Sequence, residues 1–191
     1  MRLTKLLAPA ICAAVTVMIT SVAAGAATSA APAPANSNVT VTAMHIVGFN
    51  AEVAAAHGYV IRTAPDGKQY SARQGAVAAA PKNVVSGNCG YSYVYEYGIG
   101  NRAIELYTGF SVILPEVGGH WQVRLHDRGG TSFRNYNVQP SGNGIWQIDQ
   151  VIGGLTRGPA QAVVVGAASF TILDNGAVCY SGGPSDTTTI T

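Results

Sequence analysis

The stretch that decides the fold reads Asn88-Cys89-Gly90-Tyr91-Ser92-Tyr93-Val94-Tyr95-Glu96-Tyr97. Every second residue from position 91 to position 97 is a tyrosine, and this alternation is the period of a β-strand. All of these rings therefore project from one face of the predicted strand, while Ser92, Val94 and Glu96 project from the other. We expect this strand to open the main domain of the protein.

The tyrosine side of this strand has two readings. It is either the buried face of a sandwich strand or an exposed platform that stacks on sugar rings. Cys89 stands two positions before Tyr91, so in a regular strand it would lie on the same face as the tyrosines. A disulfide that crosses a sandwich usually lies between the sheets. Ser92, Val94 and Glu96 also form the more polar set. We therefore predict that the tyrosines face the core, with hydroxyl groups hydrogen-bonded at the rim of the sheet, and keep the platform as the alternative.

Residues 1–26 have the pattern of a signal peptide. Arg2 and Lys5 charge the start, an apolar run extends from Leu6 to Gly25, and small residues follow at the positions that a signal peptidase reads. We predict cleavage after Ala26 and a secreted, extracellular protein that is free of the membrane after cleavage. A retained membrane anchor is the alternative, because about 20 apolar residues can span a bilayer.

Cleavage would change both the charge and the cysteine content. The chain has 11 Lys+Arg and 9 Asp+Glu, so the loss of Arg2 and Lys5 leaves a formal net charge of zero. No nucleic-acid partner is therefore expected. Cleavage also removes Cys12 and leaves Cys89 and Cys179, which an exported protein is expected to join in a disulfide. Two free thiols are the alternative.

Two segments precede the predicted main domain. Residues 27–37 are rich in Ala, Pro and Ser and are expected to form a flexible linker. Residues 38–80 are predicted to form a unit of one short helix, capped by Asn50, and one β-hairpin around Ala64-Pro65-Asp66-Gly67. Because an Ala-rich linker ends this unit, residues 84–191 are expected to form a stable domain without it.

Residues 84–191 are predicted to form an antiparallel β-sandwich or barrel-like domain with one disulfide. Short alternating segments are separated by Gly-rich turns, which is typical of these all-β folds. In one such segment, Trp121, Val123 and Leu125 are expected to point inward. The predicted strands span residues 91–97, 103–110, 120–127, 133–138, 145–152, 162–173 and 177–181.

The outward side of the strand at 120–127 is the most polar strand face in the sequence. It carries His120, Gln122, Arg124 and His126. We predict a solvated outer face there, with a ligand-binding surface as the alternative. The two histidines are about 20 Å apart along a strand, so they do not share one metal ion without a third element. No metal and no other cofactor is predicted.

Several further stretches match a pattern that extends over most of the chain after residue 50. They are Ala54-Ala55-Ala56-His57-Gly58-Tyr59, Pro65-Asp66-Gly67-Lys68-Gln69-Tyr70-Ser71, Asn88-Cys89-Gly90-Tyr91-Ser92-Tyr93-Val94-Tyr95, Thr108-Gly109-Phe110 and Gly176-Ala177-Val178-Cys179-Tyr180-Ser181-Gly182-Gly183-Pro184-Ser185-Asp186. Together they resemble a family of uncharacterised small secreted proteins of actinomycetes. The resemblance implies export and pairing of Cys89 with Cys179, and it transfers no catalytic residue.

The sequence thus predicts a secreted, monomeric β-sandwich protein without catalysis, which has a binding or structural role outside the cell. The sharpest version binds a polysaccharide or a cell-wall component. A second version is a proteinaceous hydrolase inhibitor that holds another secreted protein with a rigid loop, for which residues 153–160 and 115–119 are candidates.

A small secreted hydrolase is the alternative from another class. A glycosidase needs two carboxylates that converge in a cleft, and the candidates are Glu96, Glu105, Asp127 and Asp149. The sequence contains no H-E-x-x-H, G-x-S-x-G or C-x-x-C motif, so the metalloprotease, serine-hydrolase and thiol-redox patterns are missing from it.

Overall fold

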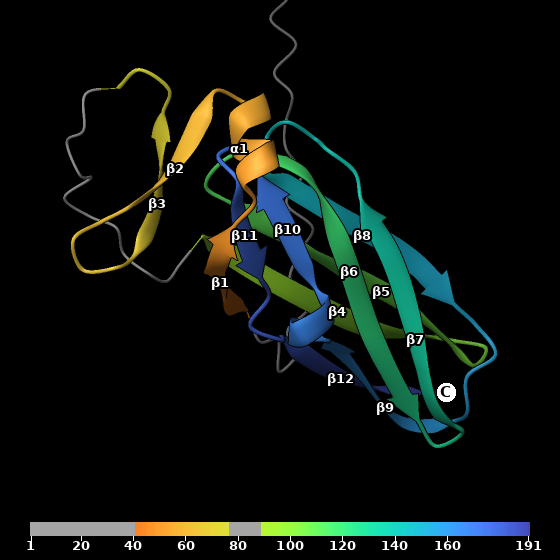
Figure 1. The fold of residues 1–191 in the computed structure, drawn as a ribbon. Coiled ribbons are helices and arrows are strands. Elements are labelled where there is room, and N and C mark those ends of the chain that lie inside the picture. Colours follow the sequence, from red (N-terminus) through yellow and green to blue (C-terminus); the bar gives the residue numbers. More distant parts are fainter. Residues whose placement is uncertain (1–40, 77–88) are drawn as a thin grey trace, which may run out of the picture. The chain divides into compact units, whose positions relative to one another are not determined.

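The computed structural model describes residues 41–76 and 89–191, and strands make up most of them (Figure 1). This confirms the predicted all-β fold. The predicted signal peptide and the linker at 27–37 lie outside the described residues. The elements are β1 (Thr42–Phe49), α1 (Ala51–Ala56), β2 (Tyr59–Thr63), β3 (Gln69–Arg73), β4 (Gly90–Gly100), β5 (Ala103–Val112), β6 (Glu116–Asp127), β7 (Gly130–Val138), β8 (Ile145–Ile152), β9 (Gly158–Val164), the 3-10 turn η1 (Gly166–Ala168), β10 (Phe170–Leu173), β11 (Ala177–Tyr180) and β12 (Ser185–Ile190).

Most strands belong to one ten-stranded antiparallel sheet that folds over into two layers. Its order is β12-β9-β6-β10-β11-β1-β4-β5-β8, and β7 pairs with β6 beside this path. Strands β4, β5 and β8 form one layer, and β6 with its neighbours forms the other (Figure 1). Strands β2 and β3 form a separate two-stranded sheet.

The two layers pack against each other through large aromatic side chains. The ring of Phe110 on β5 lies 5.4 Å from that of Trp121 on β6 and 5.8 Å from that of Trp146 on β8. Trp121 is completely buried, and its indole N–H donates to Thr108 Oγ1 at 3.0 Å. Because both the ring and its donor are satisfied between the layers, the predicted inward direction of Trp121 is confirmed.

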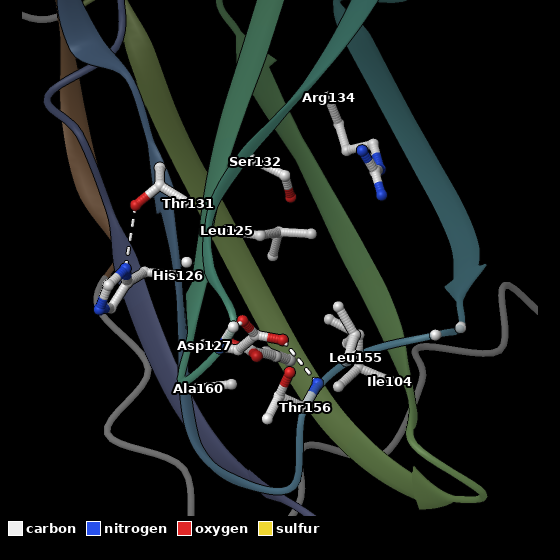
Figure 2. A pocket seen from close by; sticks show the side chains of 15 residues that line it. Ile104, Leu125, His126, Asp127, Thr131, Ser132, Arg134, Leu155, Thr156 and Ala160 are labelled. Carbon is white, nitrogen blue, oxygen red and sulfur yellow. Dashed lines mark hydrogen bonds between the residues drawn. The ribbon is translucent and has the colours of Figure 1, made fainter.

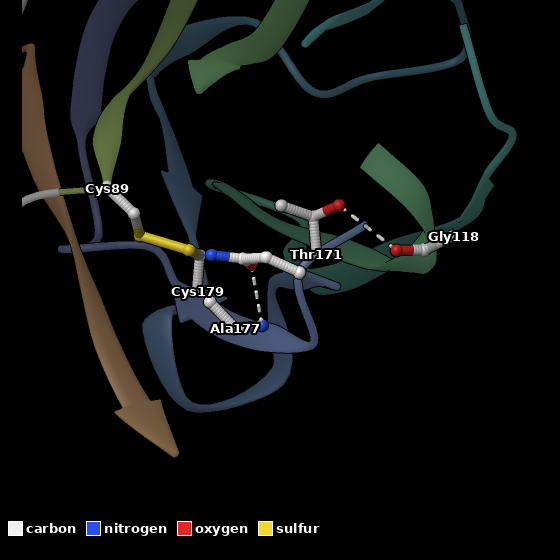
Figure 3. The surroundings of a disulfide bond; sticks show 6 residues. Cys89, Gly118, Thr171, Ala177 and Cys179 are labelled. Carbon is white, nitrogen blue, oxygen red and sulfur yellow. Dashed lines mark hydrogen bonds between the residues drawn. A yellow bond between two sulfur atoms is a disulfide. The ribbon is translucent and has the colours of Figure 1, made fainter. Parts of the chain in front are cut away.

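Strand β1 connects the two layers near the disulfide. Its first residues, from Thr42 to Met44, pair with β4, and its later residues pair with β11. The Cys89–Cys179 disulfide joins the start of β4 to β11, the two strands that flank β1 (Figure 3). The predicted pairing of these cysteines is therefore present.

The expected unit at 38–80, however, contributes a strand to the large sheet, so the sheet does not begin at residue 84.

The helix and hairpin follow the local signals in the sequence. Asn50 caps α1, because its Oδ1 accepts a hydrogen bond from the Val53 N–H at 3.0 Å. In the turn between β2 and β3, Asp66 accepts from the Lys68 N–H at 3.1 Å, and Gly67 has a positive φ of 83°. Both elements were predicted from these residues.

The predicted single strand at 162–173 is wrong. The chain forms β9 up to Val164, passes through η1 and starts again as β10, and both strands pair with β6. At this break the Val165 N–H donates to the Gln122 carbonyl at 2.9 Å. The apolar run is continuous because both pieces face the same core, so its hydrophobicity did not reveal the interruption. Strand β12 was not predicted either.

Candidate functional site

The site depends first on which face of strand β4 is buried and which face points outward. Ser92 and Val94 are completely buried and Glu96 is only 2% exposed, whereas Tyr91 is 49% exposed. The tyrosine side therefore faces outward, and the prediction that it forms the core is wrong. The alternative reading gives the correct side for the rings: Tyr91 is exposed, Tyr95 and Tyr97 are half-buried, and Tyr93 is buried within the ring cluster.

Gly90 explains why the parity of Cys89 was misleading. This glycine has a positive φ of 149°, and a Cβ atom there would overlap the Ser111 carbonyl oxygen. The chain therefore turns between Cys89 and Tyr91 in a conformation that side chains rarely allow. Cys89 points into the core although Tyr91, two residues later, points out of it.

The polarity of the opposite side was misleading as well, because the hydroxyl group of Ser92 has partners inside. Ser92 Oγ lies 3.1 Å from Thr42 Oγ1 and 2.9 Å from Ser181 Oγ. Hydrogen-bonded hydroxyl groups of this kind are compatible with complete burial. Ser92 thus belongs to the core, where it ties β4 to its neighbours.

The outward rings form a cluster that we call the tyrosine face. It consists of Tyr91, Tyr93, Tyr95 and Tyr97 on β4 and of Tyr107 on β5. The register of the hairpin sets Tyr95 directly opposite Tyr107. The Tyr93 ring lies 5.5 Å from the Tyr107 ring, 5.6 Å from the Tyr95 ring and 6.5 Å from the Tyr91 ring. These are ordinary distances for packed aromatic pairs, so the rings support one another.

Gly109 on β5 makes room for the central ring. A Cβ atom at this position would lie 2.8 Å from Tyr93 Oη and would overlap the Trp146 carbonyl oxygen. The Tyr93 phenol can therefore cross β5, where it is only 9% exposed. Burial raises the pKa of Tyr93, and the adjacent Tyr107 hydroxyl raises it further. The central ring is thus a fixed, neutral support for the rings around it.

Polar side chains of β5 and β8 border the tyrosine face. Tyr107 Oη donates to Gln147 Oε1 at 2.5 Å. Gln147 and Asp149 are both exposed, and Asp149 is paired with Tyr107 across the strands. Glu105, half-buried, is paired with Tyr97 in the same way. The face therefore combines flat apolar surface with hydrogen-bonding groups at its border.

The predicted polar surface on β6 lies on the other layer. Trp121, Val123 and Leu125 are buried, so the residues that alternate with them point outward as expected. Their polar atoms mostly have local partners, since His120 Nδ1 lies 2.8 Å from the Ala168 carbonyl, Gln122 Nε2 donates to Asn135 Oδ1 at 2.7 Å and His126 Nδ1 lies 2.9 Å from Thr131 Oγ1. Arg124 is exposed opposite Phe133. A binding role for His120, Gln122, Arg124 and His126 stays a prediction.

The four candidate carboxylates are divided between two places. Glu105 and Asp149 lie beside the tyrosine face, whereas Glu96 and Asp127 line a pocket inside one end of the sandwich (Figure 2). Asp127 accepts the Gly129 N–H at 2.7 Å and the Thr156 N–H at 2.8 Å. The Thr156 N–H is the main cause of the lowered pKa of Asp127. Because both of its oxygens hold backbone groups, Asp127 serves the local turn and is not positioned as half of a hydrolytic pair.

The two loops considered for an inhibitor have different structures. Residues 115–119 are mostly part of β6, which begins at Glu116. The segment around Leu155 is a loop, and Arg102 fixes it by donating from Nε to the Leu155 carbonyl at 2.7 Å. The Leu155 N–H in turn donates to the Arg102 carbonyl at 3.0 Å. This loop forms one wall of the pocket in Figure 2.

No protein-family model, no curated protein and no solved structure matches the chain. The resemblance to actinomycete secreted proteins therefore stays a prediction. Within residues 41–76 and 89–191, His, Cys, Asp and Glu form no group of three or more that could hold a metal ion. The same residues contain no helix that is long and apolar enough to cross a bilayer.

Proposed function

We propose that the protein is a secreted β-sandwich protein without catalysis, which binds a polysaccharide or a cell-wall glycan through the tyrosine face. The observation that carries this proposal is the outward direction of the tyrosine side chains on β4, together with Tyr107 on β5. The Cys89–Cys179 disulfide supports export, because such bonds persist in oxidising compartments.

The physical properties of the face suit a neutral sugar chain. A sugar ring has an apolar C–H surface that can stack on a phenol, and its hydroxyl groups need donors and acceptors at the border. Tyr107 with Gln147 and the carboxylates of Glu105 and Asp149 supply these groups. The two carboxylates would repel a polyanion, so a neutral glycan is favoured over a strongly acidic one.

Preorganisation also favours binding. Because the rings already pack against one another, they lose little side-chain freedom when a ligand covers them. Tyr93 fills the space above Gly109 and supports Tyr91, Tyr95 and Tyr107 from below. We therefore assign binding to the outer rings and support to Tyr93.

The test is depletion of the protein from solution by insoluble cell-wall material and by a panel of insoluble polysaccharides. The variant Tyr91→Ala/Tyr95→Ala should bind more weakly, by about twofold to tenfold for each ring, if a stacked ring contributes roughly 0.5–1.5 kcal/mol as in aromatic pairs. The matched control is Phe133→Ala on β7, because Phe133 and Tyr91 are both 49% exposed but lie on different layers. Phe133→Ala should bind as the unchanged protein does.

Two results would contradict the proposal. One is that no glycan of the panel retains the protein, whereas the protein, once immobilised on a resin, retains another secreted protein from the culture in which it was produced. The other is an equal loss of binding in Phe133→Ala and in the double tyrosine variant, which would show that adsorption depends on any exposed aromatic ring. The inhibitor reading would then become the stronger one.

A further inference from the structure

A pocket of about 310 Å³ opens at the end of the sandwich where β6 turns into β7 (Figure 2). Its apolar walls come from Ile104, Leu125 and Leu155, and polar groups lie at its ends. Figure 2 shows Arg134 at one end and Asp127 with Thr156 at the other. The tyrosine face does not contribute to this pocket, since the lining residue from β4 is Glu96, on the inward side of the strand.

Glu96 is the unusual member of the lining. Its side chain is 2% exposed, and among the described residues neither carboxylate oxygen has a hydrogen-bond partner of normal geometry. Burial raises the pKa of Glu96 to about 7, the Ala162 N–H opposes this shift and the negative charge of Asp186 adds to it. A buried carboxyl group without a partner is costly when ionised, so a cationic donor brought into the pocket would stabilise its ionised form.

The charges around Glu96 come from three strands. Asp186 on β12 is buried, and its two oxygens accept the Glu96 N–H and the Thr187 N–H. Because Asp186 is itself acidic, it does not neutralise an ionised Glu96. On β6, His126 and Asp127 line the outer part of the pocket, and Arg134 on β7 lies at the end away from Asp127. Around Glu96, the acids Asp127 and Asp186 therefore outnumber the one permanently charged base, Arg134, and apolar walls lie beside them.

We propose that this pocket binds a small organic ammonium ion, whose nitrogen is held by Glu96 and whose alkyl part lies against Leu125 and Leu155. The two carboxylate oxygens of Glu96 have no hydrogen-bond donor of normal geometry and no positive charge beside them. An ammonium group supplies both, because it has three N–H donors and a positive charge. A volume of about 310 Å³ is at the lower limit of small-molecule sites and suits a compact ligand with a short chain.

The test uses n-butylammonium as the probe and n-butanol, which has the same chain and no charge, as its control. Each is titrated into the full chain while the backbone amide signals of Leu155, Thr156 and Ala162 are followed by NMR. The ammonium ion should shift these signals with saturation, and butanol should shift them little. Because a proton on Glu96 competes with the cation, affinity should be roughly thirtyfold higher at pH 8 than at pH 5.5.

Two variants locate the site. Glu96→Gln keeps the shape of the side chain and should abolish the saturating shifts, whereas Asp149→Asn, which removes an exposed carboxylate from β8, should leave them unchanged. Equal shifts with butanol, an affinity independent of pH, or full binding by Glu96→Gln would each overturn the proposal. If Glu96→Gln does not fold, the charge and pH comparisons on the unchanged chain still decide the question.

Discussion

A chain that begins at residue 84 is expected to lose the cooperative thermal transition that a chain beginning at residue 41 retains. The shorter chain lacks β1, which lies between β11 and β4 in the sheet. Its loss would remove the completely buried Met44 and the carbonyl that accepts the Cys89 N–H at 3.0 Å. Truncating one buried methionine to alanine already costs about 2–5 kcal/mol, and a whole domain is stable by only about 5–15 kcal/mol.

The measurement is differential scanning calorimetry of both chains with the disulfide intact. The chain that begins at residue 41 is the control, since it keeps every described element. A sharp transition in the chain that begins at residue 84 would contradict this account, because it would make β1 an accessory strand. The domain boundary suggested by the Ala-rich linker would then be the real one.

Glu96→Gln is expected to stabilise the protein in alkaline solution and to change its stability little at pH 4. The pKa of Glu96 is raised to about 7 in the folded state by burial, whereas an unfolded chain has a glutamate pKa of about 4.3. Between these values the folded protein binds a proton that the unfolded chain does not bind. The free energy of unfolding therefore falls as pH rises through this range, by about 3–4 kcal/mol in total.

Glutamine remains neutral at every pH and escapes this loss. Urea unfolding of both proteins at pH 4 and pH 9 should thus show similar midpoints in acid and a clearly higher midpoint for Glu96→Gln in base. The matched control is Glu105→Gln, on the outer face of β5, which should change stability by less than about 0.5 kcal/mol at both pH values. A lower alkaline midpoint for Glu96→Gln would mean that the ionised carboxylate has a stabilising partner.

The local elements of the fold could be predicted because their causes are local. The cap of α1 by Asn50, the turn at Gly67 and the inward alternation of Trp121, Val123 and Leu125 each depend on a few neighbouring residues. The role of β1 could not be predicted in this way. Its place between β4 and β11 depends on pairing with residues far away in the sequence, for which alternation alone gives no partner.

The tyrosine face was misjudged although part of the signal was present. On β5, Ile104 and Leu106 alternate with Tyr107 and are completely buried, so Tyr107 lies on the opposite face from them. Once the β4–β5 hairpin is in register, Tyr95 pairs with Tyr107 and must share its outward face. Paired residues on adjacent strands lie on the same side of a sheet. The pairing of Tyr95 with Tyr107 is better evidence than the alternation between Cys89 and Tyr91, because the positive φ of Gly90 interrupts that alternation.

The pocket was not visible in the sequence at all. Glu96 was known as one acid among four candidates, but its neighbours in the pocket come from β6, β7 and the loop at Leu155. Only the packing of the two layers brings these groups together. Its partnerless oxygens are likewise a property of the folded core.

The outward orientation of the tyrosine side chains on β4 is the central claim, and one measurement tests it. The urea midpoints of Val94→Ala and Tyr95→Ala are compared with that of the unchanged protein, with the disulfide intact. Val94 is completely buried and Tyr95 is half-buried on the outer face. We predict that Val94→Ala costs about 2 kcal/mol and that Tyr95→Ala, although it removes a far larger group, costs about 1 kcal/mol or less. A loss of about 3–5 kcal/mol for Tyr95→Ala with little effect of Val94→Ala would place the tyrosines in the core and contradict the account.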